Sequence, residues 1–247
     1  MKLIENILYG ENEEVNLLDI YIPDGKTSSV LVYFHGGGLV RGDKNSCAPF
    51  APYLAEHGIA TVGVRYHKYP DASFPDFIYD GAKAVAWAYD YMRKELDCDK
   101  LYVAGTSAGG YISMMLCFDR RYLNSVGLDN SVIAGYYHNA GQPTAHFKVL
   151  EYSGTDPRRV IIDERAPLYY IGMEKAYPRM RFVVSDNDMK NRYEETMLLL
   201  SALRTFEYTD FDHVVMHGTH CHYCGSGKND ENGVNIFGKM LYDFLKD

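Results

Sequence analysis

Gly105-Thr-Ser-Ala-Gly-Gly110 is the stretch of this sequence that decides the fold. The residues just before it, Leu-Tyr-Val-Ala, are β-prone, and residues 111–118 after it carry apolar side chains at helical spacing. This pattern predicts a strand, a tight turn and a helix, with Ser107 in the turn. Gly105 and Gly109 would let the strand and the helix pass close to the serine. The free N–H groups and positive dipole end of the helix start favour negative charge beside the serine hydroxyl.

The rest of the chain alternates between β-prone and helical patterns. Continuous apolar runs at 30–34 and 59–64 are typical of strands that are covered on both faces. Further strands are predicted at 3–9, 17–22, 131–134, 180–184 and 213–216, and helices at 77–96, 194–206 and 232–245. This alternation predicts an α/β fold with a mostly parallel twisted sheet and helices on both faces. Residues 135–179 show no sustained period, and we expect a small cap-like insertion there, with short helices over the sheet.

Composition limits the class of protein. The chain has 247 residues, of which 47% are hydrophobic, and shows no repeat or linker, so we expect a single domain over 1–247. The net charge of -8 argues against nucleic acid or an anionic membrane surface as a partner. No apolar run approaches the roughly 18 residues of a membrane span. Because there is also no leader-like segment at the start and the 5 cysteines are scattered, we expect a cytoplasmic protein.

Polar residues gather directly after the predicted strands. They lie at 35–38, at Ser107, at 186–188 and at 217–222. Ligands of such sheets bind beyond the carboxyl ends of the strands, so these groups are expected to meet. A serine hydroxyl needs a base within hydrogen-bond reach, and the base needs an orienting acid. The chain supplies the serine first, the acids next and the histidines last.

These motifs resemble an α/β-hydrolase of the hormone-sensitive-lipase-like esterase branch. His35-Gly-Gly-Gly-Leu39 resembles its HGGG loop, and the elbow at 105–110 resembles its GDSAGG motif. Arg65-Tyr66, followed by prolines at 70 and 75, is similar to the segment after the next strand. The serine–acid–histidine order is that of the same fold. The chain departs from the branch at Thr106, where an acidic residue is usual, and has no counterpart of the long N-terminal cap.

The acid has two candidates. In the family that this chain resembles, the acid lies a few residues past the strand, usually three after a small residue. Ser185 fits the small residue, so the resemblance favours Asp188. Asp186 is the alternative, and it could instead bind the backbone of the turn.

The base has three candidates. His220 follows a strand and a glycine, as in the histidine loop of the family, and is favoured. His222 and His217 are the alternatives, and at least one of the three is a bystander.

The oxyanion hole is expected from backbone N–H groups. Ala108, directly after the serine, should supply one donor. The glycine loop should supply the others, because glycines let the backbone approach a ligand closely. We assign Gly37 and Gly38 to this role, with Gly36 as the alternative.

The spacing of Cys221 and Cys224, with histidines nearby, is also compatible with a zinc knuckle or a redox pair. No second ligand pair exists elsewhere, and the motif does not open a helix after a thioredoxin-like strand. The sequence therefore predicts no metal and no cofactor.

Together these features predict a serine esterase that uses Ser107, His220 and Asp188 and forms an acyl-enzyme. Small carboxylic esters with short acyl groups, including acetyl or aryl esters of carbohydrates, are the predicted substrates. The alternatives are an amide hydrolase, such as an arylformamidase or a small peptidase, and a ligand-binding module on the same scaffold.

Overall fold

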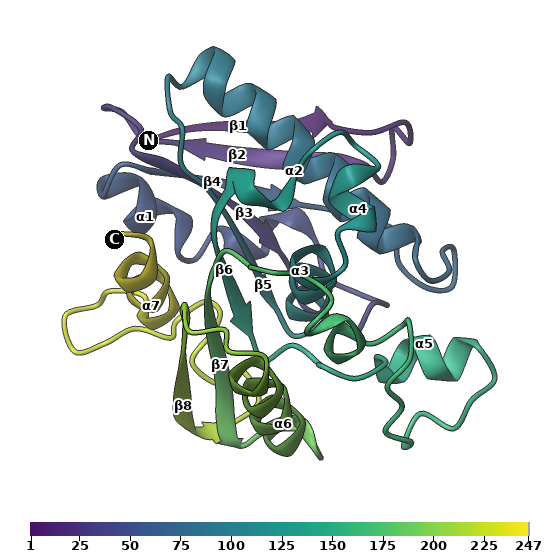
Figure 1. Ribbon diagram of the computed structural model, residues 1–247. Coiled ribbons are helices and arrows are strands. Elements are labelled where there is room, and N and C mark those ends of the chain that lie inside the picture. Colours follow the sequence, from purple (N-terminus) through teal and green to yellow (C-terminus); the bar gives the residue numbers. More distant parts are fainter. Residues whose placement is uncertain (247) are drawn as a thin grey trace.

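Eight strands form one sheet in the computed structural model, which describes residues 1–246 (Figure 1). Their order across the sheet is β1-β2-β4-β3-β5-β6-β7-β8. Strand β2 runs antiparallel to both of its neighbours, β1 and β4, and all pairs from β4 across to β8 are parallel. The predicted α/β fold with a mostly parallel sheet is therefore confirmed. The strands are β1 (Lys2–Leu8), β2 (Leu17–Ile22), β3 (Ser29–Phe34), β4 (Ile59–Val64), β5 (Leu101–Thr106), β6 (Ile133–Asn139), β7 (Arg179–Asn187) and β8 (Phe211–Thr219).

Helices cover both faces of the sheet (Figure 1). One face carries α1 (Ala51–Glu56) and α7 (Ile236–Leu245), which contact each other. The other face carries α2 (Asp76–Glu95), α3 (Ala108–Phe118), α4 (Arg121–Asn124) and α6 (Arg192–Thr205). Within residues 1–246 no helix combines the length and the apolar character that crossing a bilayer requires.

Strand β3 shows why a continuous apolar run becomes a central strand. Its side chains alternate between two hydrophobic cores: Val30, Val32 and Phe34 pack on the α2–α3 side. Leu31 and Tyr33 pack on the α1–α7 side. Because successive side chains of a strand point to opposite faces, a strand covered on both faces needs apolar residues at every position.

The insertion begins later than the predicted start at 135. Residues 135–139 continue strand β6 and pair with β5 and β7. Tyr136 and Tyr137 explain this, because each buries an aromatic ring in the core of a different face. The insertion thus runs from Ala140 to the start of β7, and it contains α5 (Phe147–Tyr152) and a short 3-10 helix (Pro167–Tyr170).

The final helix also begins later than the predicted residue 232. It starts at Ile236 because the side chain of Asn235 accepts a hydrogen bond from the backbone N–H of Gly238. Such a cap satisfies one of the free donors at a helix start and fixes where the helix begins.

The turn between β5 and α3 brings backbone against backbone. Ser107 has φ 56° and ψ -111°, a conformation that side chains rarely adopt. A Cβ atom on Gly105 would lie 2.0 Å from the carbonyl oxygen of Gly109. A Cβ on Gly109 would lie 2.0 Å from the carbonyl oxygen of Phe34. The elbow predicted from the sequence therefore requires both glycines, since any side chain would separate β3, β5 and α3.

We predict that Gly109→Ala lowers the free energy of unfolding by about 3 kcal/mol, because its methyl group meets rigid backbone on β3. Gly25→Ala is the matched control, since a Cβ there meets nothing within 4 Å. It should change stability by no more than about 0.5 kcal/mol. Urea unfolding of both variants measures the difference, and equal stabilities would contradict the close contact at the elbow.

Candidate functional site

Ser107, Asp188 and His220 each occupy the first position after a strand. These strands are β5, β7 and β8, and they run parallel, so the three residues lie at one edge of the sheet. The Nε2 atom of His220 lies 2.9 Å from Oγ of Ser107. Its Nδ1 atom lies 2.5 Å from Oδ1 of Asp188. The structure thus joins three residues that are far apart in the sequence into one hydrogen-bonded chain.

The carboxylate of Asp188 is enclosed. Its side chain is 0% exposed, and it accepts hydrogen bonds from the backbone N–H groups of Ser185 (3.2 Å) and Met189 (2.7 Å). Burial by itself raises the pKa of Asp188, but the hydrogen bonds from His220 and the backbone outweigh it and the pKa is lowered. The group is therefore ionised near neutral pH and holds the imidazole of His220 with Nε2 directed at the serine.

The alternative acid and bases lie elsewhere. Asp186 accepts a hydrogen bond from the backbone N–H of Gly218 (2.8 Å) and pairs with Nδ1 of His217 (2.5 Å). The side chain of His217 is 98% exposed. His222 points its Nδ1 at the carbonyl oxygen of Thr219 (2.9 Å). None of these side chains forms a hydrogen bond with Ser107. Asp186 instead binds the backbone of the turn, which is the role that the sequence offered for it as an alternative.

The glycine loop lies against the serine. A Cβ atom on Gly36 would lie 3.3 Å from Cβ of Ser107, and Gly37 and Gly38 have φ values of 116° and 65° that favour glycine. Within residues 1–246 the backbone N–H groups of Gly37, Gly38 and Ala108 have no hydrogen-bond partner. These donors are therefore free to bind an oxygen atom beside Ser107.

Neighbouring residues hold the glycine loop in place. The ring of Tyr66 stacks on His35 at 4.3 Å, and its hydroxyl donates to the carbonyl oxygen of His35 (2.7 Å). Arg65 donates to both carboxylate oxygens of Asp43 at 2.7 Å each. Burial lowers the pKa of His35 to about 4, so this ring is neutral. Arg65 and Tyr66, taken from the sequence as part of the resemblance, thus hold Asp43 beyond the loop and His35 at its start.

A cavity of about 430 Å³ opens over Ser107. The glycine loop forms one wall and the insertion supplies another through α5. The lining residues are Gly36, Gly37, Gly38, Val40, Arg41, Thr106, Ser107, Phe147, Lys148, Met189, His220 and Cys221. The insertion therefore lies over the candidate site and limits the space available to a ligand.

A buried polar network ties the serine turn to the histidine loop. The hydroxyl of Thr106 accepts hydrogen bonds from the hydroxyl of Tyr33 (2.9 Å) and from Nδ2 of Asn139 (3.0 Å). The hydroxyl of Tyr223 in turn donates to Oδ1 of Asn139 (2.5 Å). Thr106, which departs from the family pattern, is thus the acceptor that connects β5 to β6. We did not identify Asn139 from the sequence, because we placed the end of its strand at 134.

The two cysteines of the histidine loop have different surroundings. The sulfur of Cys224 accepts a hydrogen bond from Nδ2 of Asn139 (3.2 Å), and Cys221 lines the cavity over Ser107. Across the described part of the chain, no group of three or more His, Cys, Asp or Glu side chains is arranged to hold a metal ion.

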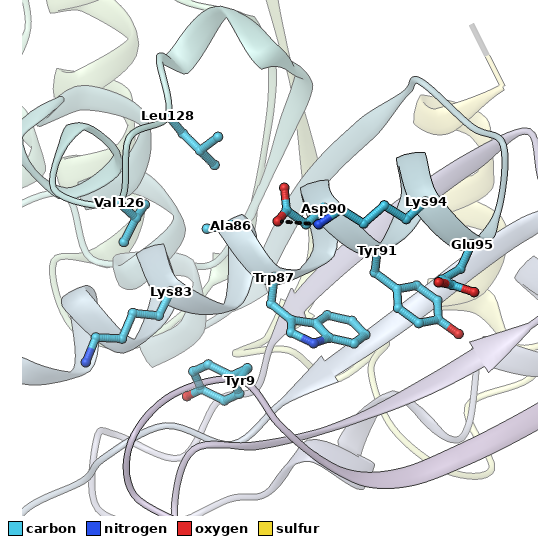
Figure 2. Close-up of a pocket in the computed structure, with 10 residues that line it drawn as sticks. All are labelled: Tyr9, Lys83, Ala86, Trp87, Asp90, Tyr91, Lys94, Glu95, Val126 and Leu128. Atoms are coloured by element: carbon cyan, nitrogen blue, oxygen red, sulfur yellow. Dashed lines mark hydrogen bonds and ion pairs between the residues drawn. The ribbon is translucent and has the colours of Figure 1, made fainter.

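A second hollow, of about 500 Å³, lies along α2 (Figure 2). Figure 2 shows Trp87 and Tyr91 side by side on that helix, and their rings stack at 4.7 Å. The hollow shares no lining residue with the cavity over Ser107. Its charged side chains include the ion pair of Asp90 and Lys94 (3.1 Å), and it contains no nucleophile with a base. The cavity over Ser107 is therefore the better candidate for a reactive site.

We predict that Tyr223→Phe lowers the free energy of unfolding by about 1–3 kcal/mol, because it leaves Oδ1 of buried Asn139 without its donor. Tyr137→Phe is the matched control. The hydroxyl of Tyr137 is also buried, and it has no hydrogen-bond partner within residues 1–246. Its removal should leave stability unchanged or raise it. Urea unfolding measures both variants, and equal losses would contradict the proposed importance of the network.

Curated proteins with similar sequences are named as ester hydrolases. A probable carboxylic ester hydrolase of Mycobacterium tuberculosis, LipM, is 35% identical over 116 residues, which are 44% of this chain and 27% of that protein. A probable isoprenylcysteine alpha-carbonyl methylesterase of rice, Oryza sativa subsp. japonica, is 29% identical over 115 residues, which are 45% of this chain and 27% of that protein. Each match thus spans about a quarter of the relative's length.

Solved structures with the same fold cover nearly the whole chain. Esterase B from Lactobacillus rhamnosis has a TM-score of 0.79 and 17% identity, and the match covers 99% of this chain and 85% of that one. A thermophilic esterase from Thermogutta terrifontis with bound propionate has a TM-score of 0.78 and 19% identity, with 97% and 92% covered. At these identities the likeness establishes the fold alone.

The α/β-hydrolase fold family matches residues 31–165, which are more than half of the chain. This range contains the glycine loop, the elbow at Ser107 and most of the insertion. The resemblance to the hormone-sensitive-lipase-like esterase branch is thereby confirmed, and the chain belongs to the α/β-hydrolase fold family.

Proposed function

We propose that this protein is a serine hydrolase that cleaves small carboxylic esters. The observation that carries the proposal is the imidazole of His220, which lies between the hydroxyl of Ser107 and the buried carboxylate of Asp188. The names of the matched relatives, which are ester hydrolases, support an ester substrate over an amide.

The first half of the reaction forms an acyl-enzyme. Oγ of Ser107 attacks the carbonyl carbon of the ester while Nε2 of His220 takes its proton. Asp188 keeps the other ring nitrogen protonated and stabilises the imidazolium. Negative charge then develops on the carbonyl oxygen, where the free N–H groups of Gly37, Gly38 and Ala108 bind it. These donors are held in place before the substrate arrives, so they stabilise the transition state without reorganising.

The second half releases the products. His220 returns its proton to the departing alcohol as the ester bond breaks. A water molecule then gives its proton to His220 and attacks the acyl carbon, and the acid leaves Ser107 free again. A short acyl group suits the cavity of about 430 Å³, which the insertion partly covers. Among esters with short acyl groups, we propose acetyl or aryl esters of carbohydrates as substrates.

We predict that Ser107→Ala lowers kcat/KM on 4-nitrophenyl acetate by about 10⁴-fold or more, because the nucleophile is lost while the fold persists. The wild type should also react covalently at Ser107 with a fluorophosphonate. Ser201→Ala, an exposed position on α6, is the control and should keep full activity and labelling. Unchanged turnover in Ser107→Ala would contradict the proposal. Absent labelling of the wild type would favour a ligand-binding module.

The pH dependence of the reaction follows from His220. Burial favours the neutral ring, but the hydrogen bonds and charges of Asp188 and Cys221 together outweigh it and raise the pKa of His220 from 6.5 to about 9. The base must be neutral to take a proton, so activity is lost as pH falls through this raised pKa. We therefore predict that the acid limb of kcat/KM has its midpoint above pH 6.5.

Asp188→Asn tests the cause of this shift. It removes the charge that stabilises the imidazolium, so the midpoint should move to lower pH while the maximal rate falls by about 10⁴-fold. Rate profiles of the two proteins on one ester, combined with NMR titration of the imidazole, measure both effects. A wild-type midpoint at or below that of the variant would show that Asp188 does not act on His220.

A further inference from the structure

Another cavity, of about 370 Å³ and distinct from the hollow along α2, adjoins the one over Ser107. The two cavities share Phe147 and Met189 in their walls. Residues 157–160 of the insertion and the start of α6 form its other sides. Because Phe147 and Met189 belong to both walls, a ligand that extends from the serine past Met189 enters the adjoining cavity, which we call the side cavity.

The lining of the side cavity is cationic although the whole chain carries a net charge of -8. Its charged residues are Arg158, Arg159, Lys190, Arg192 and Glu195. Arg158 pairs with an aspartate outside the cavity, whereas Arg159 and Lys190 make no ion pair with any described residue. Positive charge gathered in a hollow beside a site attracts anions and raises their local concentration.

Arg192 is a buried cation in this lining. It is 3% exposed, and its guanidinium donates to the carbonyl oxygen of Ala140 and to Oε1 of Gln142 (3.3 Å), which are both neutral. No carboxylate among residues 1–246 forms a salt bridge with it, although the charges of Asp188 and Glu195 act on it from a greater distance. Burial outweighs these two charges and lowers the pKa of Arg192, so an anion that enters the cavity and accepts a hydrogen bond from the guanidinium would further stabilise this buried charge.

Glu195 acts on Arg192 through its charge but forms no salt bridge with it. Its Oε2 atom is buried and has no hydrogen-bond partner in the described part of the chain. Burial raises the pKa of Glu195, while the charge of Arg192 and a hydrogen bond with Thr144 lower it in part. The side cavity thus contains one carboxylate against four cations, so its lining remains positive.

We propose that the side cavity binds a carboxylate of the substrate, so that the preferred substrates are small esters that carry a free carboxylate beyond the ester bond. This inference rests on the proposed function. The carboxylate can belong to the acyl part, as in a monoester of a short dicarboxylic acid, or to the alcohol part, as in an acylated hydroxy acid. Both place the same group beside Arg159, Lys190 and Arg192.

Two matched pairs of substrates test the proposal. The acyl pair is 4-nitrophenyl hydrogen glutarate against 4-nitrophenyl pentanoate. The alcohol pair is the acetate ester of 4-hydroxybutanoate against that of 1-butanol. We expect kcat/KM to favour the carboxylated ester by about tenfold or more in one pair, which identifies the part that carries the carboxylate. This preference should shrink as salt is added.

Reversing the charge of the exposed cations in the side cavity is the second test of the proposal. Arg159→Glu and Lys190→Glu should each lower the ratio of carboxylated to neutral ester turnover by about fivefold or more. Lys175→Glu is the matched control, since it changes the net charge equally but lines a different hollow near the start of β7. It should leave the ratio unchanged. Equal turnover within both substrate pairs would overturn the proposal, as would an equal loss in Lys175→Glu.

Calorimetry separates this proposal from the proposed function. Glutarate should bind to the wild type more tightly than the neutral diamide of the same acid, and Arg159→Glu should weaken that binding. If the protein cleaves no ester, the proposed function fails, and glutarate binding still decides whether the side cavity takes a carboxylate. If neutral esters are cleaved but glutarate does not bind, only the side-cavity proposal fails.

Discussion

Backbone contact around Ser107 is the constraint on which the rest of the site depends. Glycines at 105 and 109 allow β3, β5 and α3 to approach so closely that a single methyl group would meet a carbonyl oxygen at 2.0 Å. The same approach forces Ser107 into a conformation that side chains rarely adopt, at φ 56°. It also brings the glycine loop after β3 beside the serine. One close contact therefore positions both the half-buried serine and the glycine loop with its free N–H donors.

Parallel strands supply the other groups. Asp188 and His220 follow β7 and β8 directly, so the register of the sheet sets their distance from Ser107. Hydrogen bonds of 2.5 and 2.9 Å leave little tolerance for movement of these loops. The network through Thr106 and Asn139 acts against such movement, because it links the end of β5 to the histidine loop by buried polar contacts. The buried network that holds the reactive groups in position is thus as much part of the site as the groups themselves.

Electrostatics divide the site into two regions. Beneath the serine, the enclosed carboxylate of Asp188 favours the protonated imidazole and so prepares His220 to accept a proton. Beyond Met189, the insertion and α6 gather positive charge around buried Arg192. The insertion therefore has two effects: it limits the space over the serine and it contributes cations to the adjoining cavity. In the proposed reaction the first region performs the chemistry, and the second selects the substrate.

The elbow, the α/β alternation and the glycine loop were all predictable from the sequence, because each depends on residues that are neighbours in the chain. Local periodicity places strands and helices, and glycines mark where backbones must meet. The pairing of acid and base was different. Asp186 with His217, and Asp188 with His220, both form hydrogen-bonded pairs between β7 and β8. Only the tertiary structure decides that the second pair approaches Ser107, because that depends on which way each side chain leaves the end of its strand. The role of Asn139 and the position of Arg192 are tertiary for the same reason, since their partners come from other parts of the chain.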